Sequence, residues 1–250
     1  MTNDIKPPVA APAGRKRFWK QATIVSAGTG YVVELDGRPV KLPERTTLAV
    51  ESKALAQALA EEWQAAGKEA GGLFRPEDLP LTRIAGSMLE RIPNQREGVI
   101  QSLLAYAGSD LLCYRAENWS DLSSQQKERW DPWLAWCEKT FGAQLAVSGG
   151  VMPIKQSDAA IAALRKTLES ASDAELAVLG VAVPALGSLV LGLALLHQQA
   201  SPEDLTGCAT LDEQAQMQRW GEDTEITDRI ARMGRDVADA GRFLTLLKQG

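Results

Sequence analysis

One uncharged segment restricts the fold of this chain more than any other feature. From Leu176 to Leu196 the sequence reads LAVLGVAVPALGSLVLGLALL, 21 residues without a charged side chain. A segment of this length and hydropathy can cross a bilayer as a helix, or it can lie at the centre of a helical core. The remaining residues must therefore either leave the segment to a membrane or surround it with other secondary structure.

Residues within and beside this segment favour the core. Pro184 lacks a backbone N–H and disfavours helical geometry at Val183, and three glycines weaken the helix further. No Lys or Arg anchors either edge, and His197, which follows directly, fits a role at a helix end or at the edge of the core. We therefore predict two short helices that meet at Val183-Pro184 and are buried on most sides. A partly exposed apolar partner surface and membrane insertion are the two alternatives.

Residues 18–50 show the pattern of short β-strands. Four runs rich in β-branched and aromatic residues are separated by Gly and Pro. Gly28-Thr29-Gly30 and Asp36-Gly37 stand where hairpin turns are needed, and Asp-Gly is typical of a type I′ turn. A phosphate-binding loop at the first of these sites would have to open a helix, whereas the strand-like YVVEL follows it, so we predict a turn.

From Ser52 onward the apolar residues recur at helical spacing. Ser52 is a suitable N-cap for the first helix, and Asp131-Pro132 has the order of a cap followed by a first helical residue. A further strand is predicted at residues 144–147. The predicted helices cover residues 52–63, 80–92, 95–107, 123–129, 131–141, 158–170, 173–183, 185–199, 202–219 and 222–247.

These elements predict an α+β fold. A small, mostly antiparallel β domain occupies residues 17–80, and a larger α-helical domain occupies residues 81–250. Residues 1–16 are predicted to be a disordered tail. Its first fourteen residues contain no apolar stretch of the kind found in secretory signals, and Asp4 and the prolines argue against an amphipathic transit helix.

The composition argues against several classes of function. Lys and Arg number 27 and Asp and Glu 32, a formal net charge of −5, and the body of the chain has no basic cluster, so we expect no nucleic-acid partner. The one histidine, His197, cannot build a two-histidine metal site within one chain. The three cysteines form no CxxC pair and indicate reduced thiols. We therefore predict no metal and no cofactor.

The tryptophans are the first candidate contact residues. One helix face carries large side chains at positions i, i+3, i+7 and i+11, namely Trp130, Trp133, Cys137 and Phe141, and this pattern is typical of a core. Trp136 is predicted to point away from that face. Together with Trp119 it is a candidate for a contact surface, because tryptophan is enriched at binding hot spots.

Adjacent carboxylates are the second group of candidates. Asp212 and Glu213 are one such pair, but neighbouring positions on a helix diverge by about 100°, so this spacing does not build an acid/base pair. Solvated helix faces explain these paired carboxylates better than an acid/base role does. An enzyme that uses carboxylates or Cys113 remains a rival hypothesis, and it predicts a deep pocket with convergent polar groups.

Seven sequence blocks follow one another over residues 17–247. They are RFWK (17–20), YVVELDGRPVKLP (31–43), LAQALAEEWQA (55–65), LPLTRIAGSMLE (79–90), YAGSDLLCYRAE (106–117), WDPWLAWCEKTFGAQLAV (130–147) and LDEQAQMQRWGEDTE (211–225). In this collinear order they resemble the assembly chaperones of the ATP synthase alpha subunit, the Atp-twelve family. None of the blocks is a chemical motif by itself, and the specificity lies in their number and order.

The resemblance implies a chaperone and not an enzyme. Such a protein binds the unassembled alpha subunit of the catalytic head and prevents its aggregation until alpha pairs with beta. The resemblance also implies an N-terminal β domain, a helical C-terminal domain and no cofactor, and we expect a monomer when the protein is free. Trp220-Gly221 is not followed by the second Trp and the His of mitochondrial members, which indicates a bacterial, cytoplasmic protein. A eukaryotic homologue would lie in the mitochondrial matrix.

The resemblance also suggests partner-binding residues. Asp212 and Glu213 match an acidic cluster that the family ties to function, and Trp63 matches a family tryptophan that can equally anchor its helix in the core. Trp136 and Trp220 complete the set of predicted contacts. The rival to this hypothesis, besides an enzyme, is a membrane-peripheral protein that uses residues 176–196; stable membrane insertion is not expected.

Overall fold

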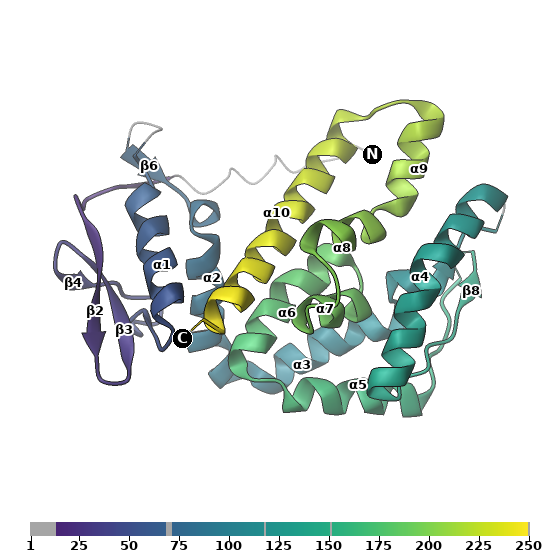
Figure 1. Cartoon of the computed structure of the whole chain (residues 1–250), viewed down its shortest axis with the longest axis horizontal. Coiled ribbons are helices and arrows are strands. Elements are labelled where there is room, and N and C mark those ends of the chain that lie inside the picture. The colour runs from purple at the N-terminus through teal and green to yellow at the C-terminus, as the bar shows by residue number, and fades with distance from the viewer. Residues whose placement is uncertain (1–13, 69–71, 118, 151, 250) are drawn as a thin grey trace, which may run out of the picture.

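The structure is a computed structural model that describes residues 14–68, 72–117, 119–150 and 152–249. Figure 1 shows a small N-terminal part of strands and two helices beside a larger helical body. The predicted α+β class is confirmed. The strands are β1 (Arg15–Lys16), β2 (Ala22–Ala27), β3 (Gly30–Leu35), β4 (Arg38–Pro39), β5 (Ala49–Val50), β6 (Leu73–Phe74), β7 (Tyr114–Arg115) and β8 (Ser148–Gly149).

Helices build most of the chain, and α10 packs against both α1 and α2 of the N-terminal part and α6 and α8 of the body. A π-helical turn, η3 (Ser87–Arg91), joins α2 to α3. The helices are α1 (Lys53–Ala65), α2 (Pro80–Gly86), α3 (Ile92–Gly108), α4 (Ser120–Phe141), α5 (Asp158–Ser170), α6 (Asp173–Leu186), α7 (Leu189–Leu196), α8 (Pro202–Ala209), α9 (Leu211–Trp220) and α10 (Thr224–Leu247).

The N-terminal sheet follows the predicted turns. β3 is central and pairs antiparallel with β2, β4 and β5. Gly28 has a φ of +61°, and Asp36 and Gly37 have φ values of +48° and +77°, as a type I′ turn requires. Ser52 caps α1, because its Oγ accepts from the Leu55 N–H at 3.2 Å. The same hydroxyl donates to the Leu246 carbonyl of α10 at 2.6 Å.

The uncharged segment forms two short helices in the core, as predicted. Every residue of α7 is buried. The break lies at Gly187-Ser188 and not at Val183-Pro184, so the predicted position is wrong. Gly187 takes the left-handed φ of +65° that ends a helix, and Ser188 caps α7, whereas Pro184 falls in the last turn of α6, where its missing N–H removes only one helical hydrogen bond.

Close packing and a buried carboxylate hold α7 in place. A Cβ at position 192 would overlap the side chain of Val183, so Gly192 permits the close approach of α7 to α6. Asp110 is fully buried and accepts from the N–H groups of Leu112 and Val190, both at 3.1 Å. Burial raises its pKa to about 6. Among the described residues, no helix is long and apolar enough to cross a membrane.

Several local predictions differ from the structure. The predicted helices 123–129 and 131–141 are one helix, α4, with Pro132 inside it, because the buried Trp130 and Cys137 pack both halves against the body. Residues 144–147 form no strand; β8 follows them and pairs in parallel with β7. Residues 202–219 divide at Thr210 into α8 and α9. The predicted tail lies outside the described residues up to position 13, and Arg15–Lys16 form β1 against β6.

Candidate partner-binding surface

The structure distributes the five predicted contact residues over three regions. Asp212, Glu213 and Trp220 belong to α9, Trp63 belongs to α1, and Trp136 belongs to α4. Figure 1 places α1 in the N-terminal part and α9 and α4 in the helical body. These residues therefore cannot form one compact site.

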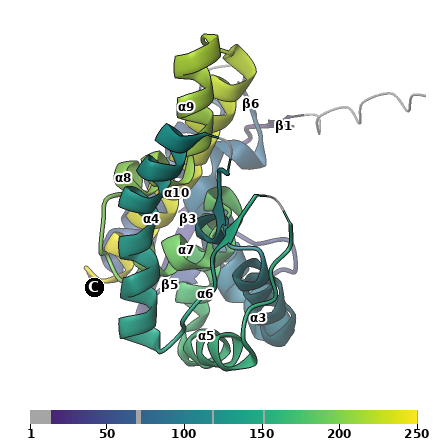
Figure 2. The same cartoon turned by 90° about the vertical axis from the view of Figure 1, so that its right-hand side faces the viewer.

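A surface hollow of about 690 Å³ lies where α9 ends beside the start of α4, next to β7 and β8. Figure 2 shows α9 above the N-terminal turns of α4. We call it the Trp119–Trp220 hollow. The lining side chains that matter below are Glu117, Trp119, Met152, Asp212, Arg219 and Trp220.

Aromatic and apolar side chains form the rim of the Trp119–Trp220 hollow. Trp220 is 68% exposed and Met152 is 73% exposed. The rings of Trp119 and Trp220 meet edge to face with centroids 5.4 Å apart. The Arg219 guanidinium lies 5.0 Å from the Trp119 ring centroid and 5.6 Å from that of Trp220. Exposed tryptophan and methionine in one place are typical of a protein-binding surface.

Asp212 lies half-buried in this hollow. Its Oδ1 accepts from Gln126 Nε2 at 2.7 Å, and the buried Gln126 is held in turn through its Oε1, which accepts from the Ala116 N–H at 2.8 Å. Burial raises the pKa of Asp212, the Gln126 hydrogen bond and the charge of Arg115 oppose that rise, and the charge of Glu213 adds to it. Gln126 of α4 therefore positions the Asp212 carboxylate, but its hydrogen bond and the charge of Arg115 do not fully offset the cost of burying that charge.

Glu213 has a different role from its neighbour. It forms an ion pair with Arg229 of α10 at 2.6 Å, and its side chain is 21% exposed. The two adjacent carboxylates diverge as the helical spacing predicts: Asp212 faces the Trp119–Trp220 hollow, and Glu213 ties α9 to α10. They do not form an acid/base pair.

Trp63 lies in an aromatic cluster of the N-terminal part. Its ring meets those of Trp19 and Phe74 edge to face, with centroids 5.2 and 5.8 Å away. Its carbonyl accepts from Trp19 Nε1 at 3.1 Å, and its own Nε1 is buried without a hydrogen-bond partner among the described residues. The core interpretation of Trp63 is therefore supported, although one side of the residue lines a cleft.

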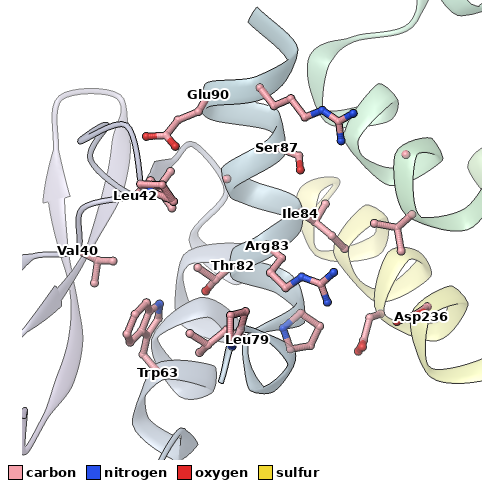
Figure 3. A pocket seen from close by; sticks show the side chains of 18 of the residues that line it. Val40, Leu42, Trp63, Leu79, Thr82, Arg83, Ile84, Ser87, Glu90 and Asp236 are labelled. Carbon is pink, nitrogen blue, oxygen red and sulfur yellow. The ribbon is translucent and has the colours of Figure 1, made fainter. Parts of the chain in front are cut away.

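The cleft beside Trp63 has a volume of about 1050 Å³, and residues of α2 and η3 form part of its lining. In Figure 3, Trp63 and Val40, the residue after β4, lie on one side of α2, and Asp236 of α10 lies on the other, facing Arg83. Val181, Pro184 and Ala185 of α6 also line it, so it uncovers a strip of the otherwise buried apolar segment.

Trp136 joins the aromatic face from which it was predicted to turn away. Its ring centroid lies 6.2 Å from that of Trp133 and 5.2 Å from that of Phe141. An indole is large enough to reach neighbours across the side of a helix, which is why the angular argument fails here. His197 ends α7 and lies 6.1 Å from the Trp136 ring, consistent with its predicted place at a helix end.

The cysteines do not resemble catalytic nucleophiles. All three are buried. Burial raises the pKa of the Cys113 and Cys137 thiols to about 12 and that of Cys208 to about 11, so the thiols stay protonated at neutral pH. Within the described ranges, no group of three or more His, Cys, Asp or Glu residues is placed to hold a metal ion.

Sequence reasoning missed several residues of the Trp119–Trp220 hollow. Arg219 precedes Trp220 in the last block, but nothing in that order indicates that it lies over two rings. No local sequence pattern indicates Met152 or Gln126. The exposure of Met152 and the hydrogen bond from Gln126 to Asp212 both arise only from packing.

Known proteins share both sequence and fold with this chain. A family described as ATP12 chaperone protein matches residues 16–138. Protein atp12, mitochondrial, of Schizosaccharomyces pombe is 26% identical over 225 residues, which are 86% of this chain and 76% of that protein. Atp12 from Paracoccus denitrificans, whose crystal structure is known, has 34% sequence identity to this chain. The two structures match with a TM-score of 0.83 over 93% of this chain and 98% of that one. Atu1473 of Agrobacterium tumefaciens is 32% identical, with a TM-score of 0.82 over 94% and 85%.

Proposed function

Because the chain belongs to the ATP12 family of ATP synthase assembly chaperones, we propose that it binds the unassembled alpha subunit of the catalytic head. It would prevent aggregation of alpha until alpha pairs with beta, as a monomer when free and without a cofactor or a catalytic step. Both solved relatives are bacterial, which supports the predicted bacterial branch, and we propose the bacterial cytoplasm as its compartment.

The observation that carries this proposal is the exposed Trp220 at the rim of a hollow that also holds a half-buried carboxylate. An unassembled subunit exposes apolar surface that aggregates until it is covered. A chaperone for it needs a complementary apolar surface, and hot spots are tryptophan-rich patches surrounded by polar groups. The Trp119–Trp220 hollow has this composition.

Each predicted residue has its place in the proposal. Asp212 and Trp220 lie at the centre of the contact surface, and Glu213 supports it by holding α9 on α10. A stable interface buries about 800 Å² on each partner, so contacts extend beyond the hollow. Trp136 and Trp63, on α4 and α1, would meet other parts of a large client.

Co-expression tests this function. Alpha produced alone with the full chain should stay soluble and co-purify with it. Trp220→Ala should weaken binding of alpha about thirtyfold and lower the co-purified amount correspondingly, because loss of a hot-spot side chain costs about 2 kcal/mol. Val25→Ala is the control: Val25 is 44% exposed on β2 and belongs neither to the hollow nor to the aromatic cluster around Trp63, so its loss should leave capture unchanged. If alpha aggregates equally with and without the chain, the proposal fails.

A further inference from the structure

Two carboxylates line the Trp119–Trp220 hollow without an ion pair to the described residues. Asp212 uses Oδ1 for the Gln126 hydrogen bond, and no hydrogen bond from the described residues reaches its Oδ2. Glu117 lies against the backbone of β8, where a Cβ at Gly149 would come within 2.6 Å of its Oε1. Neither carboxylate forms an ion pair within the described ranges. The neighbouring Arg115 is already paired with Asp131 at 2.7 Å.

Arg219 lies over two rings of this hollow. Arg115, Arg165 and Arg229 each form an ion pair with a carboxylate. Arg219 forms no hydrogen bond or ion pair with the described residues, and its guanidinium lies over the rings of Trp119 and Trp220. An exposed cation–π contact is worth about 0.5–1 kcal/mol, so this guanidinium can be displaced at little cost.

We propose that the Trp119–Trp220 hollow binds an arginine side chain of the client. In the free protein, the Arg219 guanidinium occupies the position that the client's guanidinium takes. A planar guanidinium can stack on indole rings and donate several N–H groups to carboxylates at the same time. The rings supply the first requirement, and Asp212 and Glu117 supply the second. The identity of the client rests on the proposed function, but the recognition of a guanidinium does not.

Free N-acetyl-arginine amide is the probe. It is titrated into the full-length chain while the indole N–H signals are followed by NMR, assigned through Trp119→Phe and Trp220→Phe. The signals of Trp119 and Trp220 should shift and saturate. That of Trp130, which is buried and donates to the Cys208 carbonyl at 2.9 Å, should not. N-acetyl-citrulline amide has the same shape without the charge and should cause no shift; equal shifts with it would overturn the proposal.

Three variants separate the parts of the site. Asp212→Asn should weaken probe binding about tenfold, the size expected of a charge-assisted hydrogen bond, and Glu117→Gln should weaken it less. Arg219→Gln should strengthen binding, because it removes the competing guanidinium. Asp121→Asn, an exposed carboxylate at the start of α4 outside the hollow, is the control and should change nothing.

The opposite results contradict the proposal. Loss of binding in Arg219→Gln, with N-acetyl-glutamate amide shifting the wild-type signals, would mean that the hollow takes an anion. Unchanged binding in Asp212→Asn would overturn the role of Asp212. If that variant misfolds, which a shifted Trp130 signal would report, the Glu117→Gln variant decides whether carboxylates bind the probe. Probe binding without capture of alpha would contradict the proposed function alone, and capture without probe binding would contradict this inference alone.

Discussion

Two arginine–tryptophan clusters in this molecule have nearly the same ring geometry and opposite surroundings. Trp19 and Trp63 meet with centroids 5.2 Å apart and Trp119 and Trp220 with centroids 5.4 Å apart, both edge to face. A guanidinium lies 4.8 Å from the ring centroid of Trp19 and 5.0 Å from that of Trp119. Yet Trp19 is 3% exposed, whereas Trp220 is 68% exposed.

The hydrogen bonds of the two arginines explain the difference. Arg17 donates to backbone carbonyls of the segment between β1 and β2 and of the C-terminal end of α1, among them those of Trp19 at 3.0 Å, Gln64 at 2.9 Å and the C-cap Ala66 at 2.6 Å. Arg219 donates to none of the described residues. Ring geometry alone therefore does not tell a structural cluster from an open one; the fixed donors of Arg17 close the N-terminal cluster, and their absence leaves the Trp119–Trp220 hollow available.

The largest expected effect tests this contrast directly. Arg17→Ala should lower the free energy of unfolding by about 3 kcal/mol, because it leaves several partly buried carbonyls without donors. Arg219→Ala should change it by no more than about 0.5 kcal/mol. Urea denaturation of both variants measures the difference. Equal losses would show that the two clusters are both structural and would break the comparison.

A carboxylate beside each cluster provides the next test. Glu62, next to Trp63, accepts from the Leu81 N–H at 2.7 Å and from the Thr82 N–H and hydroxyl at 2.9 and 2.6 Å, and so caps α2. Glu62→Gln should cost about 1–2 kcal/mol of stability, since an amide has one acceptor oxygen. Asp212→Asn should cost less than about 0.5 kcal/mol, because that carboxylate accepts one bond and is otherwise available. Comparable thermal shifts in the two variants would contradict this.

The smallest effect is a pH dependence. Burial raises the pKa of both Glu62 and Asp212. A carboxyl whose pKa is raised by folding binds more protons in the folded state than in the unfolded state. Its contribution to the free energy of unfolding is therefore fully present below the pKa of the unfolded state and is lost as the pH rises through the pKa of the folded state. In the hollow the same shift means that Asp212 loses its charge at a higher pH than an ordinary aspartate.

Binding of N-acetyl-arginine amide should consequently weaken a few-fold on acidification, beginning above pH 3.8, the ordinary value for this carboxyl. Asp212→Asn should reduce this dependence more than Glu117→Gln does. NMR titrations at several pH values provide the measurement. An identical pH profile in Asp212→Asn would assign the titration to another group.

The sequence predicted those parts of the fold that depend on local chemistry. Asp36-Gly37 forms its turn because few other residues accept positive φ, and Ser52 caps its helix through its own hydroxyl. The predicted break was misplaced because Pro184 and Gly187 are both helix breakers. Pro184 is tolerated in the last turn of α6, whereas Gly187 takes the left-handed φ of +65° and Ser188 caps α7.

The candidate site was predictable only in part. Asp212 and Trp220 were identified because they stand in a family block, not because of any chemical spacing. Glu117 and Met152 come from other segments, and only the parallel pairing of β7 with β8 brings those segments together beside α9. A pattern with period 2 or 3.6 carries no information about contacts between elements so far apart in the chain.

The bond from Ser52 to Leu246 also bears on how the protein is made. It joins residues 194 positions apart, and α10 packs on α1 and α2 as well as on the helices of the body. Domains usually fold in order as they leave the ribosome. Here the N-terminal sheet and its helix emerge early but must wait for nearly 200 further residues before their last contacts form. During that interval the surfaces of α1 and α2 that α10 covers in the finished fold stay exposed to solvent.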